Sequence, residues 1–317
     1  LPRRHVPDSR GHVLLLTLAL LTPPADSAVP LDSAVALDSA VARDLAVAPG
    51  ETLRITITGA GQSVVLIPGL FGGAFGYRAV VAPLVARGYR CIVIEPLGYG
   101  WSSHPKQADY SFTAQTLRIG AALDSLGVGR ALFVAQSTGA AIALRLAVAR
   151  PDLVRGLLAI DGGPVESAAT PGMKKAFKLG GMAAKLVLDE SKLRHDVRRE
   201  IIRNSGDTSW VTDAVIREYT AGQAADLDGA IDAFHQMSKA KETDSLAERL
   251  SGYPGPVRLL VGTVRHPAEV SDAQQALLRE RLPDFRSESV SGSGQYINEE
   301  QPAVVVAAVL GLDQASH

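Results

Sequence analysis

The stretch Ala135-Gln136-Ser137-Thr138-Gly139 decides the fold. It follows a short apolar run and opens a nearly all-apolar segment, an order that predicts a strand, a sharp turn and a helix with Ser137 at the tip of the turn. Such a turn needs small residues two positions before and after the serine, and Ala135 and Gly139 meet that need. The turn lifts the hydroxyl clear of the sheet and aims helix N–H groups at it. The alternative is that Ser137 is only a helix N-cap.

Short apolar runs recur on both sides of this stretch, separated by helix-length segments. Continuous apolar strands suit a parallel sheet covered on both faces, and their alternation with helices indicates a doubly wound α/β fold. The earliest segment, Thr52–Thr58, alternates apolar and polar residues, which predicts an antiparallel edge strand. The other predicted strands are 64–67, 91–94, 131–135, 157–160 and 259–261, and the predicted helices are 77–87, 112–126, 139–150, 272–281 and 303–310.

One long segment interrupts this alternation. Residues 164–253 show only helical, charge-rich patterning, which predicts a helical lid inserted after the sixth core strand. Within it, residues 173–188 place lysines beside apolar side chains that either pack on the core or line an apolar substrate pocket. The core is therefore expected to comprise residues 50–163 and 254–313.

The N-terminal region is expected to lie outside the core. Three arginines among the first ten residues precede the apolar run Val13–Leu21 and a stretch of small residues, the order of a secretory signal. Residues 1–28 are predicted to be a signal peptide, and residues 29–49, with a tandem Leu-Asp-Ser-Ala-Val-Ala repeat, a low-complexity linker. The protein is expected to be exported, periplasmic or secreted, if the signal is genuine, and cytoplasmic otherwise.

Composition excludes several functional classes. The formal net charge of −1 provides no broad basic field for nucleic acid, and no run reaches the roughly 18–20 apolar residues of a transmembrane helix, so no stable membrane insertion is expected. The single cysteine, Cys91, excludes an internal disulfide framework. No histidine–carboxylate cluster has metal-ligand spacing, so we expect no metal and no cofactor. The sequence indicates no oligomeric state.

A glycine-rich loop follows the predicted strand 64–67. It reads Pro68-Gly69-Leu70-Phe71-Gly72-Gly73, and its glycines let the backbone approach a ligand closely. Its spacing is not that of a dinucleotide-binding loop. A backbone N–H from this loop, together with that of Thr138, can bind a carbonyl oxyanion.

Together with Ser137, this loop resembles the lid-bearing α/β-hydrolases. Two further stretches resemble the same family: residues 95–102 are similar to its loop after the next strand, and residues 291–302 to its histidine loop before the last helix. The resemblance implies an α/β-hydrolase fold, Ser137 as nucleophile, and an oxyanion hole formed by the N–H groups of Leu70 and Thr138.

The family order along the chain is nucleophile, acid and histidine. The loop 262–267, where the acid most often stands, has no carboxylate, and Asp272 comes later at a predicted helix start. The resemblance therefore assigns the acid to Asp161, at the end of the strand before the lid. The alternative is that Asp161 caps the Gly162-Gly163 turn.

Gln295 stands where the family has its catalytic histidine. An amide cannot act as a general base, and loss of one triad member typically leaves roughly 10³–10⁴-fold catalysis over water. We expect Gln295 to hold Asp161 and Ser137 in place by hydrogen bonds. His266, on the same rim as Ser137, is the candidate surrogate base; the alternative is an exposed loop histidine.

Two functions follow from these residues. The first is a serine hydrolase that acts on a small ester or related acyl substrate, with activity impaired by Gln295. The second is a non-catalytic small-ligand-binding protein on a hydrolase scaffold, which explains Gln295 directly. Either function implies a small apolar or acyl molecule as the partner, and no nucleic acid.

Overall fold

The computed structural model describes residues 40–168 and 189–316. The predicted signal peptide, residues 29–39 of the predicted linker and lid residues 173–188 lie outside these ranges.

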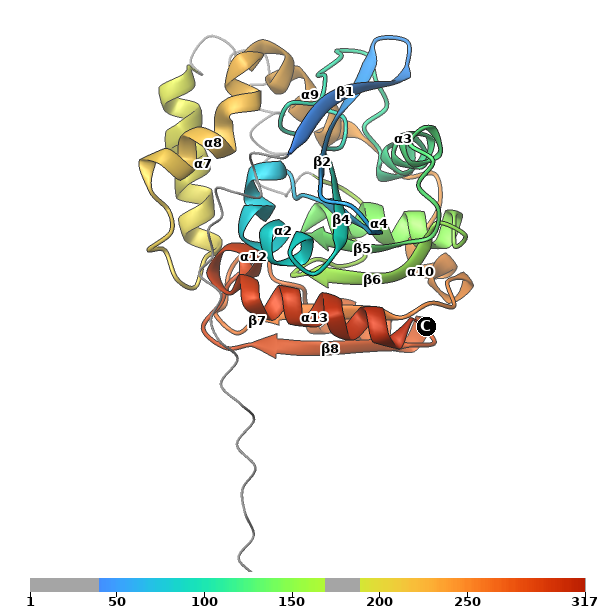
Figure 1. Ribbon diagram of the computed structural model, residues 1–317. Coiled ribbons are helices and arrows are strands. Elements are labelled where there is room, and N and C mark those ends of the chain that lie inside the picture. The colour runs from blue at the N-terminus through green and yellow to red at the C-terminus, as the bar shows by residue number, and fades with distance from the viewer. Residues whose placement is uncertain (1–39, 169–188, 317) are drawn as a thin grey trace, which may run out of the picture. The chain divides into compact units, whose positions relative to one another are not determined.

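The described residues form an eight-stranded sheet in the order β1-β2-β4-β3-β5-β6-β7-β8 (Figure 1). Strands β3 to β8 pair in parallel, whereas β2 pairs antiparallel with both β1 and β4. The predicted mostly parallel, doubly wound sheet is confirmed. The strands are β1 Val41–Ala48, β2 Glu51–Thr58, β3 Gln62–Ile67, β4 Tyr89–Ile94, β5 Ala131–Gln136, β6 Val154–Ile160, β7 Val257–Gly262 and β8 Phe285–Val290.

Helices cover both faces of this sheet. The helices are η1 Ala74–Tyr77, α2 Arg78–Val85, α3 Phe112–Ser125, α4 Thr138–Ala149, α7 Glu190–Asn204, α8 Asp213–Ala225, α9 Leu227–Lys239, α10 Leu246–Arg249, η2 Leu250–Gly252, α11 Asp272–Arg281, α12 Ile297–Glu300 and α13 Pro302–Ala315. On strand β3, Val65 and Ile67 pack with α3 and α4, whereas Val64 and Leu66 pack with α2 and α13. Because both faces are buried, the central strands are apolar over most of their length, as in Val64–Ile67.

Three elements differ from the sequence prediction. Residues 41–48, assigned to a linker, form β1 and pair with β2 across the turn at Pro49-Gly50, because Leu45 and Val47 pack on the core. Strand β2 is therefore antiparallel, as predicted, but it is not the edge strand. Strand β8 was not predicted, because its side chains are mostly polar and exposed at the other edge of the sheet.

The chain between β6 and β7 is helical in its described part, from α7 to η2, and we call residues 164–253 the insertion. Helices α7 and α8 have an apolar cluster of their own, which includes Val197, Ile201 and Ile216. Tyr296, from the loop before α12, completes this cluster and packs against Trp210 at a ring distance of 5.4 Å. The insertion is thus packed against the loop that contains Gln295.

Arg145 on α4 connects both ends of the insertion to the core. It is buried and contacts the carboxylates of Glu166 at the start of the insertion and of Asp244 near its end, the latter at 2.8 Å. A third carboxylate, Glu242, lies 3.5 Å from its Nε and accepts a hydrogen bond from the Phe112 N–H of α3 at 2.6 Å. The two ends of the insertion are therefore held on α4, the helix that begins next to Ser137.

We expect Arg145→Met to lower the free energy of unfolding by about 3 kcal/mol, because the buried Glu242 would lose its cation. Methionine keeps much of the apolar stem, so the effect reports on charge. The matched control is Arg150→Met at the end of the same helix, whose partners Asp124 and Asp152 are exposed, and which should change stability little. Urea unfolding measures both; equal midpoints for the two variants would contradict the anchoring role.

Candidate active site

Ser137 occupies a strained turn between β5 and α4. Its backbone has φ 52° and ψ −122°, a left-handed region that costs a non-glycine residue about 1–3 kcal/mol. The side chain makes no capping hydrogen bond to the helix. Ser137 therefore precedes the helix without capping it through its side chain, and its positive φ is the backbone conformation expected at a nucleophile turn.

Two glycines make this turn possible. A Cβ atom on Gly139 would lie 2.6 Å from the carbonyl oxygens of both Ile67 and Pro68. A Cβ atom on Gly162 would lie 2.4 Å from the carbonyl oxygen of Ser137. The ends of β3 and β6 therefore press against the turn on both sides, and only glycine fits at these two contacts.

Gln295 contacts Ser137 directly. Its Nε2 donates a hydrogen bond to Ser137 Oγ at 2.9 Å, and the side chain is buried. The backbone of Gln295 is fixed from two sides: its N–H donates to the Asn204 carbonyl at the end of α7 at 2.7 Å, and its carbonyl accepts from Gln136 Nε2 at 3.3 Å. The amide group is thus a well-positioned donor to the serine oxygen.

Asp161 has a different partner from the one predicted. Its Oδ2 lies 2.6 Å from His266 Nε2, and its Oδ1 accepts a hydrogen bond from the Val270 N–H at 3.4 Å. Both side chains of the Asp161–His266 pair are almost completely buried. Burial raises the pKa of the Asp161 carboxyl, and the hydrogen bond with His266 opposes that shift.

One prediction about these residues is therefore wrong, and one alternative is excluded. Gln295 hydrogen-bonds Ser137 but not Asp161, because the two carboxylate oxygens are taken by His266 and Val270. His266 is not an exposed loop residue; it turns inward because the buried carboxylate needs a donor. Asp272, the other carboxylate considered, is exposed in the first turn of α11.

The N–H groups of Leu70 and Thr138 lie on the two segments that meet at Ser137. Leu70 follows Gly69, where a Cβ atom would be 3.1 Å from Ser137 Cβ, and Thr138 is the first residue of α4. Within residues 40–168 and 189–316, neither N–H donates a hydrogen bond to another group. Both are therefore available as donors next to the serine hydroxyl.

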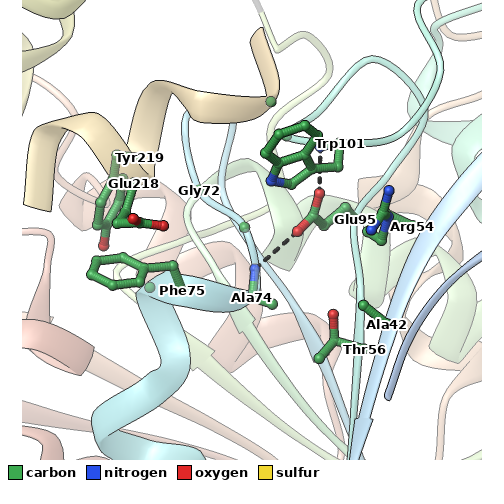
Figure 2. Close-up of a pocket in the computed structure, with 14 residues that line it drawn as sticks. Ala42, Arg54, Thr56, Gly72, Ala74, Phe75, Glu95, Trp101, Glu218 and Tyr219 are labelled. Carbon is green, nitrogen blue, oxygen red and sulfur yellow. Dashed lines mark hydrogen bonds between the residues drawn. The ribbon is translucent and has the colours of Figure 1, made fainter. Parts of the chain in front are cut away.

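A buried carboxylate that sequence reasoning missed holds the glycine-rich loop in place. Glu95 accepts hydrogen bonds from the N–H groups of Ala74, at 3.0 Å, and Trp101, at 2.6 Å (Figure 2). Burial raises the pKa of Glu95. Gly73 and Gly100 leave room for it, since a Cβ atom at either would lie within 2.8 Å of a carboxylate oxygen. The signal in the sequence was an acidic residue directly after an apolar strand.

A cavity of about 170 Å³ lies beside Glu95, and its lining includes Arg54, Phe75, Trp101 and Tyr219, whose side chains are labelled in Figure 2. Ser137 and Gln295 do not line it, so this cavity is separate from the serine. Among the described side chains, no group of three or more histidine, cysteine or acidic residues is placed to hold a metal ion. The described helices include none with the length and apolar content needed to cross a membrane.

Comparison with known proteins agrees with this architecture. Residues 62–196 match the family model described as the alpha/beta hydrolase fold. The model superposes on the epoxide hydrolase CorEH with a TM-score of 0.72 at 19% identity, covering 86% of this chain and 98% of that one. An esterase from Thermogutta terrifontis superposes with a TM-score of 0.70 at 20% identity, covering 88% and 99%.

The chain belongs to the α/β-hydrolase superfamily. Its sequence is 26% identical to mouse sn-1-specific diacylglycerol lipase ABHD11 over 258 residues, which are 78% of this chain and 79% of that protein. It is 27% identical to the AB hydrolase superfamily protein YfhM of Bacillus subtilis (strain 168) over 273 residues, or 82% and 94%. These relatives support a hydrolase.

A strained serine turn is typical of the superfamily. In this chain, the neighbouring Gln136 also helps to position the loops around the serine. Gln136, next to Ser137, joins two loops: its Oε1 accepts from the Gly69 N–H at 3.4 Å, and its Nε2 donates to the Gln295 carbonyl. The sequence pattern at the turn assigned Gln136 no role. Its long polar side chain inside an otherwise apolar segment was the available signal.

We expect Gly139→Ala to lower the free energy of unfolding by about 1–3 kcal/mol, because the new methyl group would overlap two backbone oxygens that cannot move independently of the sheet. Gly129→Ala is the matched control: it lies just before β5, and no atom would be within 4 Å of its Cβ. That variant should be neutral or slightly more stable. Thermal and urea unfolding test this, and equal stability of both variants would argue against the crowding.

Proposed function

We propose that this α/β-hydrolase is a serine hydrolase that acts on a small ester or related acyl substrate through Ser137. The observation that supports the proposal most directly is the strained turn, which holds the Ser137 hydroxyl off the helix and against residue 295. Strain of this kind persists where the surrounding structure maintains it, and such positions cluster at active sites.

In the proposed reaction, Ser137 Oγ attacks the substrate carbonyl carbon. A bond forms between Oγ and that carbon, and the carbonyl electron pair moves to the oxygen. The resulting oxyanion is stabilised by the N–H groups of Leu70 and Thr138, which have no other acceptor in the described residues. The oxyanion then reforms the carbonyl, the ester C–O bond breaks, and the alcohol leaves with the proton that Ser137 lost. Water hydrolyses the acyl-serine to release the acid and returns a proton to Ser137.

Gln295 limits the rate of this reaction. Its Nε2 donates to Ser137 Oγ, and an amide does not take up a proton near neutral pH. An ester substrate suits such a site because an alkoxide leaves more readily than an amine. The name of the mouse relative, a diacylglycerol lipase, and that of the Thermogutta terrifontis neighbour, an esterase, are in keeping with an ester.

A second function is favoured by one observation. The Gln295 amide donates to the serine oxygen while Asp161 is bonded to His266, so Ser137, Asp161 and Gln295 do not form a continuous chain of hydrogen bonds. A scaffold that binds a small acyl ligand without turnover would have this arrangement. The kinetic tests below distinguish the two functions.

The wild-type protein is expected to hydrolyse p-nitrophenyl acetate or butyrate slowly, and Ser137→Ala should lower kcat/KM at least 100-fold, because the nucleophile is removed. A fluorophosphonate should label Ser137, as located by peptide mass spectrometry. Ser209→Ala, an exposed serine in the insertion, serves as the control and should leave the rate unchanged. Turnover that survives Ser137→Ala would refute Ser137 as nucleophile.

Gln295→His is expected to raise kcat/KM about 100-fold, because a general base would then stand within hydrogen-bonding reach of Ser137 Oγ. Gln295→Ala is the matched control: it removes the amide without adding a base, and should not raise the rate. A wild type with no turnover and an active Gln295→His variant would favour the binding scaffold. Silence of Gln295→His across a panel of esters would count against both the hydrolase and the role of position 295.

A further inference from the structure

The Asp161–His266 pair lies at the same sheet edge as Ser137. Gly162, next to Asp161, presses against the backbone of Ser137. The loop that carries His266 runs beside the loop that carries Gln295, since the Val264 N–H donates to the Ser293 carbonyl at 3.0 Å. A Cβ atom on Gly262 would also lie 2.4 Å from the carbonyl oxygen of Gly294. Ser137, Gln295 and the buried pair are therefore neighbours, although they come from separate segments.

The pair has the hydrogen-bonding pattern of a general base. The Asp161 carboxylate at 2.6 Å accepts the proton of His266 Nε2, which leaves Nδ1 as the ring atom with a free lone pair. Nδ1 is buried, and in the described part of the chain it has no hydrogen-bond partner. Glu269, which is paired with Arg265 at 3.0 Å, is the other charged group that acts on Asp161.

The Ser137 hydroxyl, in turn, lacks a hydrogen-bond acceptor among the described residues. Its oxygen already accepts a hydrogen bond from Gln295, and none of the described residues accepts its hydroxyl proton. The Ser137 hydroxyl is thus a donor without an acceptor, and His266 Nδ1 is an acceptor without a donor. Both lie at one edge of the sheet. A single water molecule can join such a pair, because general bases act directly or through one water.

We propose that His266, oriented by Asp161, is the proton acceptor for Ser137 through one water molecule. The proposal rests on the function proposed for Ser137. As Oγ bonds to the carbonyl carbon, its proton passes to the water, and a proton of that water passes to Nδ1. Asp161 stabilises the imidazolium, which returns the proton to the departing alkoxide. A second water attacks the acyl-serine in the same way and regenerates Ser137.

The test uses the full chain and p-nitrophenyl esters. His266→Asn should lower kcat/KM at least 100-fold and remove the rising limb of the pH–rate profile. Asp161→Asn should lower the rate as well, because an amide that donates to Nε2 favours the opposite tautomer. His195→Asn, an exposed histidine on α7, is the matched control and should match the wild type. Thermal unfolding of each variant checks that it folds.

Rescue separates a chemical role from a structural one. Added imidazole should restore part of the activity of His266→Ala, and the double variant Ser137→Ala/His266→Ala measures the reaction of imidazole with the ester alone. Loss of activity without rescue and with an unchanged pH profile would assign His266 a structural role and overturn the proposal.

If His266→Asn is as active as the wild type and Ser137→Ala is inactive, His266 is not the proton acceptor but Ser137 remains the nucleophile. Retention of activity in both would refute the hydrolase itself.

Discussion

Backbone crowding around Ser137 is the constraint on which the site depends. Gly139 brings α4 against the carbonyl oxygens at the end of β3, and Gly162 brings the end of β6 against the serine backbone. Three chain segments thereby meet with no side chains between them. These backbone contacts fix the positions of three groups relative to one another: the loop of Leu70, Ser137 and Asp161. Because residue 295 takes no part in the contacts, the turn persists when that residue is glutamine.

The side chains around this turn form two hydrogen-bonded pairs, Ser137–Gln295 and Asp161–His266. The residue type at position 295 affects which residue type is needed at position 266. A buried carboxylate without a donor costs several kcal/mol. With glutamine at position 295 directed at Ser137, Asp161 would lack a side-chain donor unless another segment supplied one. His266 supplies it at 2.6 Å from the loop after β7. His266 therefore supplies the side-chain hydrogen bond to Asp161 that glutamine at position 295 does not supply.

Much of the fold could be predicted from the sequence because the central strands contain continuous apolar runs, such as Val64–Ile67, and because the turn at Ser137 has a short-range signature. Strands β1 and β8 could not be predicted in the same way. Both lie at an edge of the sheet, where half-exposed or polar side chains carry little hydrophobic signal. At the site, the order of segments located Ser137, Asp161 and Gln295, but the partner of Asp161 depends on two side chains that approach from different loops, which spacing along the chain does not encode.

The Ser137–Gln295 pair and the Asp161–His266 pair are also attached to different parts of the molecule. Gln295 is tied to the insertion: its N–H donates to Asn204, and the neighbouring Gly294 would meet the same carbonyl at 2.3 Å if it had a Cβ atom. Glu300 strengthens this connection, since its carboxylate accepts from the N–H groups of Gly206 and Gly294, each at 3.1 Å. Asp161 and His266, by contrast, follow β6 and β7 of the central sheet.

A displacement of the end of α7 would therefore act directly on the donor at Ser137, and would reach the buried pair only through the hydrogen bond between Val264 and Ser293. A proton acceptor that must stay in register with Ser137 is better placed in a loop that, in the described part of the chain, has no hydrogen bond to α7 than in the loop of Tyr296, which packs against the insertion. In this chain the loop after β7 holds the imidazole, and the loop after β8, which is hydrogen-bonded to the end of α7, holds the amide.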